Sequence, residues 1–483
     1  MIGAGVGGLA AAARLAAAGH AVCVCEQAST VGGKLGVYER DGFRFDTGPS
    51  LVTMPGILAA LFADTGAPLE EVLELTEVDP IARYRYADGT VLDLHRDPLA
   101  RAAALETALH PGSSLEWQRF LRRAERIWHA AEEPFLRNPL SLWALLPRIG
   151  ELPAIAPHRS MADLGRRYLT DPRLRMLLDR YATYQGADPR RAPAALVTIP
   201  YIEQTFGEWY VTGGLGRIGA ALADRVGELG GEIRLGTDVT AVRTVGERAV
   251  GVDLADGSFL PADLVVANAD ATHLYRDLVT TSRARRAHRR LARLEPSLSG
   301  FVLLLGVDGV TPGLAHHNVL FPADYEAEFD AIFGRYPRPV PDPTLYVVAT
   351  RDPATAPAGS QAWFVLANAP RQGPVDWSAA GVADRYAAHL LDVLARRGFD
   401  VRARARFVEH RSPLELARRT RAVGGAIYGT SSNGAQAAFL RPTNRSPVTG
   451  LFLVGGSAHP GGGLPVVLRS AEIVARQIGR ADR

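Results

Sequence analysis

Residues 1–8 read MIGAGVGG, and this stretch places Gly3, Gly5 and Gly8 in the pattern G-x-G-x-x-G just before an Ala-rich segment. In a strand–turn–helix unit, such glycines allow a tight turn, close approach of backbone N–H groups to a diphosphate, and close packing of the helix on its sheet. The N-terminus of that helix adds partial positive charge. The stretch therefore predicts a dinucleotide site followed by a helix over 9–18, which Gly19 ends.

The next segment, residues 22–26, reads VCVCE and predicts a second strand that ends in an acid. Glu26 stands at the distance expected for a carboxylate that accepts hydrogen bonds from the ribose hydroxyls of a dinucleotide. The alternative is a Gly-rich turn in an ordinary α/β unit. Only Met1 and Ile2 precede Gly3, although the strand that leads into the turn should be central in a parallel sheet. We therefore expect that Met1 is not the native first residue and that several apolar residues belong upstream.

Length and composition favour a soluble protein of two domains. The chain has 483 residues, which is too many for one compact core. Its hydrophobic content of 47% and charged content of 22% are ordinary for a globular protein, and a net charge of +3 gives no reason to expect nucleic acid as a partner. Cys23 and Cys25 are two positions apart in the predicted strand, and we expect no disulfide between them and no metal-ligand spacing. This favours the cytoplasm, and no run of 18 apolar residues predicts a membrane span.

The pattern along the chain predicts an α/β fold. Residues 99–185 are helical in pattern, without strand candidates, and predict a helical insertion. We predict a Rossmann-like domain assembled from residues 1–75, 205–285 and 424–483, and a mixed α+β substrate domain from residues 76–204 and 286–423. Asp88-Gly89 predicts a hairpin between strands over 81–86 and 91–95. Further predicted elements are helices over 56–64, 68–75, 215–229, 379–397 and 466–478 and strands over 232–235, 239–245, 249–254, 264–268, 301–306, 319–321, 345–349, 362–367, 404–408 and 451–456.

A second Gly-rich strand-to-helix turn, at residues 455–465, indicates which dinucleotide to expect. An NAD domain normally completes its nucleotide site within one contiguous block, whereas this turn closes the domain at the far end of the chain. The N-terminus of the following helix is another positive pole. It suits a flavin ring, because the pyrimidine end of the ring gathers negative charge on reduction. The sequence therefore favours FAD over NAD.

Several motifs together resemble one enzyme family over essentially the whole chain. They are the turn at 3–8, Glu26, Gly32-Gly33-Lys34, FDTGPS at 45–50, VTAV at 239–242, Asn268-Ala269-Asp270, Tyr428-Gly429, FLRP at 439–442 and GGSAHPGGGLP at 455–465. The set resembles the FAD-dependent phytoene desaturase family of carotenoid biosynthesis, and residues 459–465 are its most diagnostic piece. The resemblance implies the fold of the flavin amine oxidases and a bacterial carotenoid desaturase activity.

The resemblance also implies a set of FAD-binding residues. The ADP half would be held by Gly3, Gly5, Gly8, Glu26 and Lys34. The turn at Gly32 and Gly33 would bring Lys34 to the phosphates. Val239 would contact adenine through its backbone. The flavin would lie against Gly48, Pro49, Ser50, Gly463, Leu464 and Pro465, beyond the closing turn at Gly455 and Gly456. This chain departs from the family pattern at Thr212, where Pro is usual, and at Val466, where Gly is common. We expect Val466, beside the flavin, to mark a subgroup with a different substrate.

Desaturation needs a hydride acceptor, which FAD supplies, and a destination for a proton. Asp171 and Arg175 match family positions proposed as proton-handling groups. The alternative is structural, with Asp171 and Pro172 as the start of a helix and Asp171 and Arg175 as an i,i+4 pair. Water or a carbonyl group is another candidate acceptor. His459, beside the flavin turn, is either a structural contact or an acid–base group.

The expected substrate is a long apolar polyene, which is insoluble in water and has to be collected at a bilayer surface. Residues 140–156 carry the apolar side chains and the Trp143 typical of a membrane-dipping element, or of an amphipathic core helix. The arginines of residues 283–293 form either a solvated helix face or a contact with anionic lipid. We expect a cytoplasmic protein that is peripheral on the cytoplasmic membrane and passes electrons to a quinone or to oxygen.

Three other functions stay open. The first keeps the fold and changes the reaction, to that of a carotenoid ketolase, oxygenase or isomerase. The second is a soluble flavin amine oxidase, for which we expect a small polar pocket lined by aromatic residues. A long apolar tunnel that opens beside residues 140–156 would exclude it. The third is a binding or scaffold protein that holds no flavin.

Overall fold

A short parallel sheet carries the N-terminal glycine turn. The computed structural model describes residues 1–139, 155–434 and 441–481 of the chain. The strands of the sheet are β1 (Cys23–Cys25), β8 (Glu232–Arg234), β12 (Val265–Ala267) and β18 (Leu451–Leu453). β1 pairs with β8 and β12 pairs with β18, both in parallel, and Ile2 joins the two pairs through single parallel bridges to Cys25 and Ala267. Segments far apart in the chain therefore form one sheet with Ile2 at its centre.

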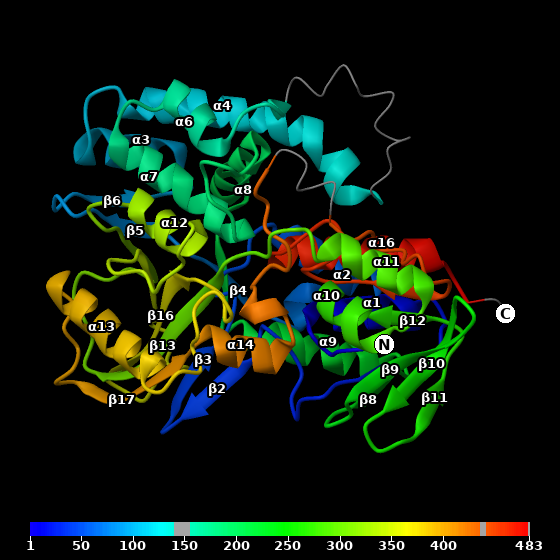
Figure 1. Ribbon diagram of the computed structural model, residues 1–483. Coiled ribbons are helices and arrows are strands. Elements are labelled where there is room, and N and C mark those ends of the chain that lie inside the picture. The colour runs from blue at the N-terminus through cyan, green and yellow to red at the C-terminus, as the bar shows by residue number, and fades with distance from the viewer. Residues whose placement is uncertain (140–154, 435–440, 482–483) are drawn as a thin grey trace.

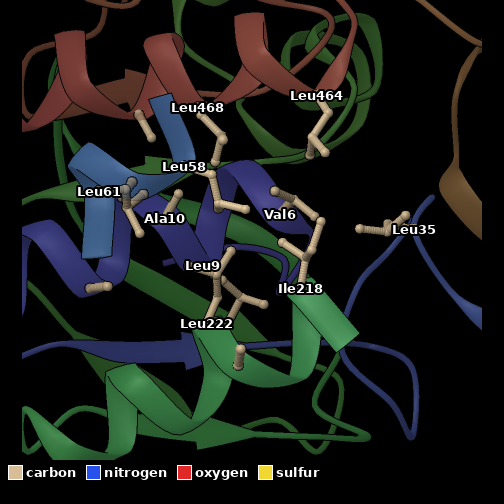
Figure 2. Packing of buried hydrophobic residues seen from close by; sticks show 14 of the residues in the cluster. Val6, Leu9, Ala10, Leu35, Leu58, Leu61, Ile218, Leu222, Leu464 and Leu468 are labelled. Atoms are coloured by element: carbon tan, nitrogen blue, oxygen red, sulfur yellow. The ribbon is translucent and has the colours of Figure 1, made fainter. Parts of the chain in front are cut away.

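Four helices surround the glycine turn and share one hydrophobic core. They are α1 (Val6–Ala17), α2 (Pro55–Asp64), α9 (Gly216–Glu228) and α16 (Leu464–Ile478). Figure 2 shows side chains from all four in this core, among them Leu9 of α1, Leu58 of α2, Leu222 of α9 and Leu468 of α16. Burial of each such leucine contributes about 1.5–3 kcal/mol. The core thus fixes the N-termini of α1 and α16 relative to the sheet.

The second sheet has seven strands. In spatial order they are β17 (Ala405–Arg411), β13 (Ser299–Asp308), β16 (Ser360–Ala369), β15 (Leu345–Ala349), β14 (His317–Leu320), β5 (Ala82–Arg85) and β6 (Val91–Leu94). Neighbours in this sheet are antiparallel except for β14 and β5, which are parallel. β5 and β6 enclose the predicted turn at Asp88-Gly89, where Gly89 has a φ of 87°. The strands predicted for this region are confirmed.

A layer of helices covers one end of this sheet, at the top of Figure 1. It contains α3 (Pro98–Ala108), α4 (Ser113–Ala131), α6 (Met161–Tyr168), α7 (Pro172–Arg180) and α8 (Thr198–Phe206). Trp117 and Phe120 of α4 share a buried cluster with Tyr84 of β5 and with Phe321, which joins the layer to the sheet. Where residues 99–185 are described, the predicted helical block without strands is confirmed. Residues 140–154 of the predicted membrane-dipping element lie outside the described residues.

The helix predicted over 68–75 is wrong. Leu69–Glu71 form a single 3-10 turn, and the chain then enters β4 (Leu75–Glu77), which pairs in the antiparallel direction with β7 (Trp209–Val211). A three-residue strand is too short to show an alternating pattern in the sequence. Its partner β7 is also far away along the chain, so the local sequence gives no sign of the pairing.

The remaining elements flank the two sheets. They are β2 (Val37–Arg40), β3 (Phe43–Asp46), β9 (Val239–Val245), β10 (Arg248–Leu254), β11 (Phe259–Pro261), α10 (Ala271–His273), α11 (Ser282–Leu291), α12 (Glu326–Phe333), α13 (Val382–Arg396), α14 (Pro413–Thr420), π-helical turns at Glu132–Arg137 and Leu274–Leu278, and 3-10 turns at Tyr181–Gln185, Ala194–Val197 and Val423–Gly425. The N- and C-terminal ends both lie in the part of the molecule that contains α1 and α16 (Figure 1). The residue boundaries of the two predicted domains stay a prediction.

Candidate active site

A cavity of about 900 Å³ is lined by residues of both sheets and of the helical layer. The predicted FAD-binding residues that line it are Gly3, Gly5, Glu26, Gly32, Gly33, Lys34, Gly48, Pro49, Ser50, Val239, Gly456, Gly463, Leu464 and Pro465. Gly8 and Gly455 are absent from this lining, and both are buried. The structure therefore brings together residues that are distributed over the full length of the chain.

The glycine turn is as tight as its sequence predicts. A Cβ atom added to Gly8 would lie 2.2 Å from the carbonyl oxygen of Gly3, so no other residue fits where α1 leaves the sheet. Gly3 has a φ of 89°, and Gly5 is the N-cap of α1 with no side chain capping the helix. The N-terminus of α1 is thus left to a ligand, which is the arrangement that binds a diphosphate.

Asn268 is a packing partner of the turn whose role the sequence left unassigned. A Cβ atom added to Gly5 would lie 2.7 Å from Nδ2 of Asn268. A Cβ atom added to Gly7 would lie 2.8 Å from Oδ1 of Asn268, and one added to Gly455 would lie 2.4 Å from the same oxygen. The Asn268 side chain therefore fills the space that these glycines leave, and it joins the first glycine turn to the last one. Its position directly after a buried apolar strand, β12, is the signal that could have indicated it.

Glu26 is held in place with its carboxylate at the cavity. Oε2 accepts a hydrogen bond from the N–H of Ala4 at 2.7 Å, and Oε1 accepts one from the N–H of Ala28 at 2.9 Å. Each carboxylate oxygen can accept a second hydrogen bond. Glu26 can therefore receive the two hydroxyls of a ribose without moving.

Positive charge lines the same end of the cavity. Lys34 lines the cavity and is exposed to it, and its Nζ atom donates to the carbonyl oxygens of Ile427 at 2.5 Å and Ala426 at 3.4 Å. Desolvation by the surrounding protein lowers the pKa of this ammonium, and the charge of Asp270 partly opposes that change. A contact of Lys34 with phosphate stays a prediction. Arg418, Arg419 and Arg421, at the end of α14, also line the cavity; the sequence run Arg-Arg-Thr-Arg could have indicated them.

The other end of the predicted FAD site has room for a planar ring. Gly463 is the N-cap of α16, with a φ of 102°, and an added Cβ there would meet no atom within 4 Å. A Cβ atom added to Gly48 would lie 2.0 Å from the carbonyl oxygen of Lys34, so Gly48 packs tightly on the Gly32-Gly33-Lys34 segment. Open space in front of a helix N-terminus, with two glycine-rich segments beside it, fits a flavin.

The structure does not bring Asp171 and Arg175 to the cavity. Asp171 is the N-cap of α7, its carboxylate accepts hydrogen bonds from the backbone and the guanidinium of Arg173, and Pro172 follows it. Burial opposes ionisation of Asp171, but these hydrogen bonds hold its pKa below the usual value. The expected i,i+4 pair is wrong, because Arg175 donates instead to the carbonyl of Leu169 at 2.8 Å. These contacts are structural, and they give no support to a catalytic role.

Replacement of Asp171 by Ala should lower the free energy of unfolding by about 1 kcal/mol, because the N-cap hydrogen bond is lost. Asp171→Asn keeps a capping side chain and should lose less. Urea unfolding measures both values. At full FAD occupancy, neither variant should change the rate of flavin reduction by substrate. A loss of about a hundredfold or more in Asp171→Asn would instead restore the catalytic role.

His459 is also held by structural contacts. It is buried, its Nε2 atom lies 2.9 Å from the carbonyl oxygen of Asn138, and burial lowers the pKa of its imidazole. It does not line the cavity. The neutral ring therefore links the C-terminal glycine turn to the segment that follows α4.

Away from the glycine turns, the cavity wall is mostly apolar. The helical layer contributes Trp128, Leu136, Ile199 and Ile202, and the seven-stranded sheet contributes Val302, Phe364 and Leu366. A polar cluster interrupts this wall, where Arg180, Tyr184, Glu203 and Tyr346 line the cavity next to Ser50. The sequence reasoning missed these four residues, since each is an isolated polar position within a helical or strand pattern. The cavity thus joins a glycine-rich end to an apolar end that contains one buried polar cluster.

The chain has the fold of known flavin oxidoreductases. A solved oxidoreductase from Methanosarcina mazei aligns with a TM-score of 0.66 over 98% of this chain and 99% of its own, at 18% identity. A solved putrescine oxidase variant aligns with a TM-score of 0.67 over 99% of this chain and 97% of its own, at 15% identity. Identities this low establish a common fold and nothing more.

Relatives in sequence cover the full chain. The chain is 36% identical to a 4,4'-diapolycopene oxygenase from Methylomonas sp, over 99% of this chain and 97% of that protein. It is 35% identical to a zeta-carotene-forming phytoene desaturase from Myxococcus xanthus, over 99% and 93%. It is 36% identical to a hydroxyneurosporene desaturase from Rhodobacter capsulatus, over 100% and 97%. The model of the flavin containing amine oxidoreductase family matches residues 6–479. These matches show that the chain is an FAD-dependent oxidoreductase that belongs to the flavin containing amine oxidoreductase family, in its group of carotenoid desaturases and oxygenases.

Proposed function

We propose that this oxidoreductase desaturates a carotenoid or a related long polyene. The observation that carries the proposal is the continuity of the cavity, which leads from the glycine turns of the FAD site directly into the apolar wall formed by Trp128, Ile199, Ile202 and Phe364. A polyene has few polar atoms, so apolar surface is what binds it and excludes water. The names of the relatives support the same substrate class.

In this function each part of the site has a separate role. Bound FAD supplies the capacity to accept a hydride. The N-terminus of α1 and Glu26 hold the ADP half, Gly48 and Ser50 with Gly463 and Leu464 position the ring, and the apolar wall aligns the polyene against it. Val466 also lines the cavity beside Pro465, and we propose that its side chain contributes to the choice of substrate.

Flavin reduction by substrate tests the proposal. Purified protein loaded with FAD is mixed without oxygen with vesicles that carry phytoene or a more unsaturated polyene. Loss of flavin absorbance together with a red shift of the polyene spectrum is the expected result. Stable FAD binding with no reduction by any polyene contradicts the proposal, and reduction by amines with release of peroxide points to an amine oxidase instead.

A second candidate function is oxygenation of a carotenoid, and the 36% identity to a 4,4'-diapolycopene oxygenase favours it. Analysis of pigments extracted after co-expression with a polyene-producing pathway separates the two reactions. A desaturase product gains double bonds and no oxygen, whereas an oxygenase product gains mass from oxygen.

We also propose that the protein takes its substrate from a membrane surface and passes electrons to a quinone or to oxygen. Among the described helices, none has the length and apolar character that a membrane span requires. The arginines of α11, among them Arg283, Arg286 and Arg290, are exposed, as expected for a solvated helix face, and contact with anionic lipid stays a prediction. Sedimentation with vesicles of zwitterionic or anionic lipid tests whether the protein binds a membrane surface.

Rates of flavin reoxidation with a soluble quinone or with oxygen test which of the two is the electron acceptor.

A further inference from the structure

Two buried acids interact where α8 meets the cavity. Glu203, near the end of α8, and Glu208, just before β7, are each 2% exposed, and Glu203 lines the cavity. The hydroxyl of Tyr181 donates to Oε1 of Glu203, and the charge of Glu203 acts directly on the carboxyl group of Glu208. Two buried carboxyl groups that interact in this way do not readily ionise together, which favours one ionised and one protonated carboxyl group. The pair therefore has one open position for a second proton.

Arg180 supplies the positive charge that acts on the pair. Its guanidinium lies 4.9 Å above the ring of Tyr184 and 5.2 Å above that of Tyr346, and within the described part of the chain no ion pair joins it to a carboxylate. Burial raises the pKa of Glu203 above its usual value. The neighbouring Glu208, the hydroxyl of Tyr181 and the charge of Arg180 offset part of this rise. Burial and the charge of Glu203 raise the pKa of Glu208 well above its usual value.

A chain of polar contacts leads from this pair to the segment predicted to face the flavin. Oε2 of Glu208 and Nε2 of His317 are buried, have no hydrogen-bond partner among the described residues and lie 3.6 Å apart. Nδ1 of His317 lies 2.8 Å from the hydroxyl of Tyr346, which in turn lies 2.8 Å from Oγ of Ser50. Burial lowers the pKa of His317 well below its usual value, so the ring is neutral. Oε2 of Glu208 and Nε2 of His317 therefore do not form an ion pair. They mark a place where a proton can be held.

The other acids that line the cavity have different partners. Glu26 and Asp270 belong to the nucleotide end, where Asp270 is the N-cap of α10. Asp238 is paired with Arg421, and Glu132 is paired with Arg137. Of the cavity-lining acids in the described residues, Glu203 is the one that faces the apolar part without an ion pair.

We propose that Glu203, supported by Glu208, is the catalytic acceptor of the proton that desaturation releases. The inference rests on the proposed function. One C–H bond of the polyene loses hydride, whose electron pair passes to the flavin. The C–H bond on the neighbouring carbon loses its proton to the Glu203 carboxylate, and the electron pair left behind forms the new C=C bond. The polyene is oxidised by two electrons and the flavin is reduced by two.

Two variants test this proposal. Glu203→Gln and Glu208→Gln keep side-chain size, and Glu125→Gln is a matched control, because Glu125 on α4 contacts the hydroxyl of Tyr201 outside the cavity. We expect Glu203→Gln to slow flavin reduction by a bound polyene by about a hundredfold or more, with unchanged FAD binding. Infrared difference spectra of the FAD-free proteins at neutral pH should lose a protonated-carboxyl band in Glu203→Gln and in Glu208→Gln, and should be unchanged in Glu125→Gln.

The outcomes separate this inference from the proposed function. Flavin reduction in Glu203→Gln within about threefold of the wild-type rate overturns the inference and leaves the proposed function intact. Infrared spectra in which neither glutamine variant loses a protonated carboxyl overturn the singly ionised pair whatever the rates are. A wild-type protein that binds FAD and is reduced by no polyene overturns the proposed function itself, and the catalytic assignment falls with it.

Discussion

Replacement of Gly8 by Ala is expected to abolish FAD binding and to weaken the fold. The new Cβ would lie 2.2 Å from the carbonyl oxygen of Gly3 and 3.1 Å from Cβ of Asn268. Both neighbours are fixed, one as backbone and the other by its packing against further glycines. α1 must therefore move away from the sheet, at a cost of about 1–3 kcal/mol, and its N-terminus leaves the position that a diphosphate needs.

Gly227→Ala is the matched control for this prediction. Gly227 lies inside α9, and an added Cβ there meets no atom within 4 Å. Because alanine favours helix more than glycine does, this variant should be neutral or more stable by roughly 0.4–1 kcal/mol. Bound FAD measured by absorbance and the urea midpoint of the FAD-free protein test both variants. Gly8→Ala protein that retains wild-type FAD content contradicts the account of the turn.

The glycine turns of the candidate FAD site could be predicted from the sequence because their role depends on backbone geometry. A position such as Gly8 or Gly48 has no room for a side chain, so only glycine fits it, and the requirement is visible in the sequence without knowledge of the fold. Glu26 could be placed for a related reason, since it ends a strand whose distance from the turn is fixed by one helix. The helices and strands were likewise predictable where their patterns were long.

The buried pair of acids could not be predicted in the same way. Glu203 and Glu208 are five positions apart, but Arg180, His317 and Tyr346 reach them from α7, β14 and β15, and no local pattern encodes that meeting. Asp171 and Arg175 illustrate the opposite case, in which a recognisable motif turned out to be the start of a helix. Burial gives the acids their raised pKa values, and burial of a single polar residue is set by the tertiary structure.

Replacement of Arg180 by Gln should shift the pH dependence of flavin reduction to higher pH. The groups that face the two acids are Arg180, Tyr181 and Tyr184, Tyr84 of β5, His317 of β14 and Tyr346 of β15. Arg180 is the positive charge among them, and it lowers the pKa of both Glu203 and Glu208. Without it both pKa values rise, so at neutral pH more molecules hold two protons on the pair and have no open acceptor.

The rate of flavin reduction at neutral pH should therefore fall roughly tenfold or more in Arg180→Gln and recover as the pH is raised. Arg180→Lys keeps the charge and is the matched variant, so its pH profile should stay close to that of the wild type. Single-turnover reduction measured across pH, at full FAD occupancy, distinguishes the two. A uniform loss at every pH in both variants means that Arg180 supports the structure of the cavity, whereas an unchanged profile in Arg180→Gln means that the acids do not depend on its charge. The predicted upward shift, restored by lysine, follows only if the pair must be singly ionised to accept the proton.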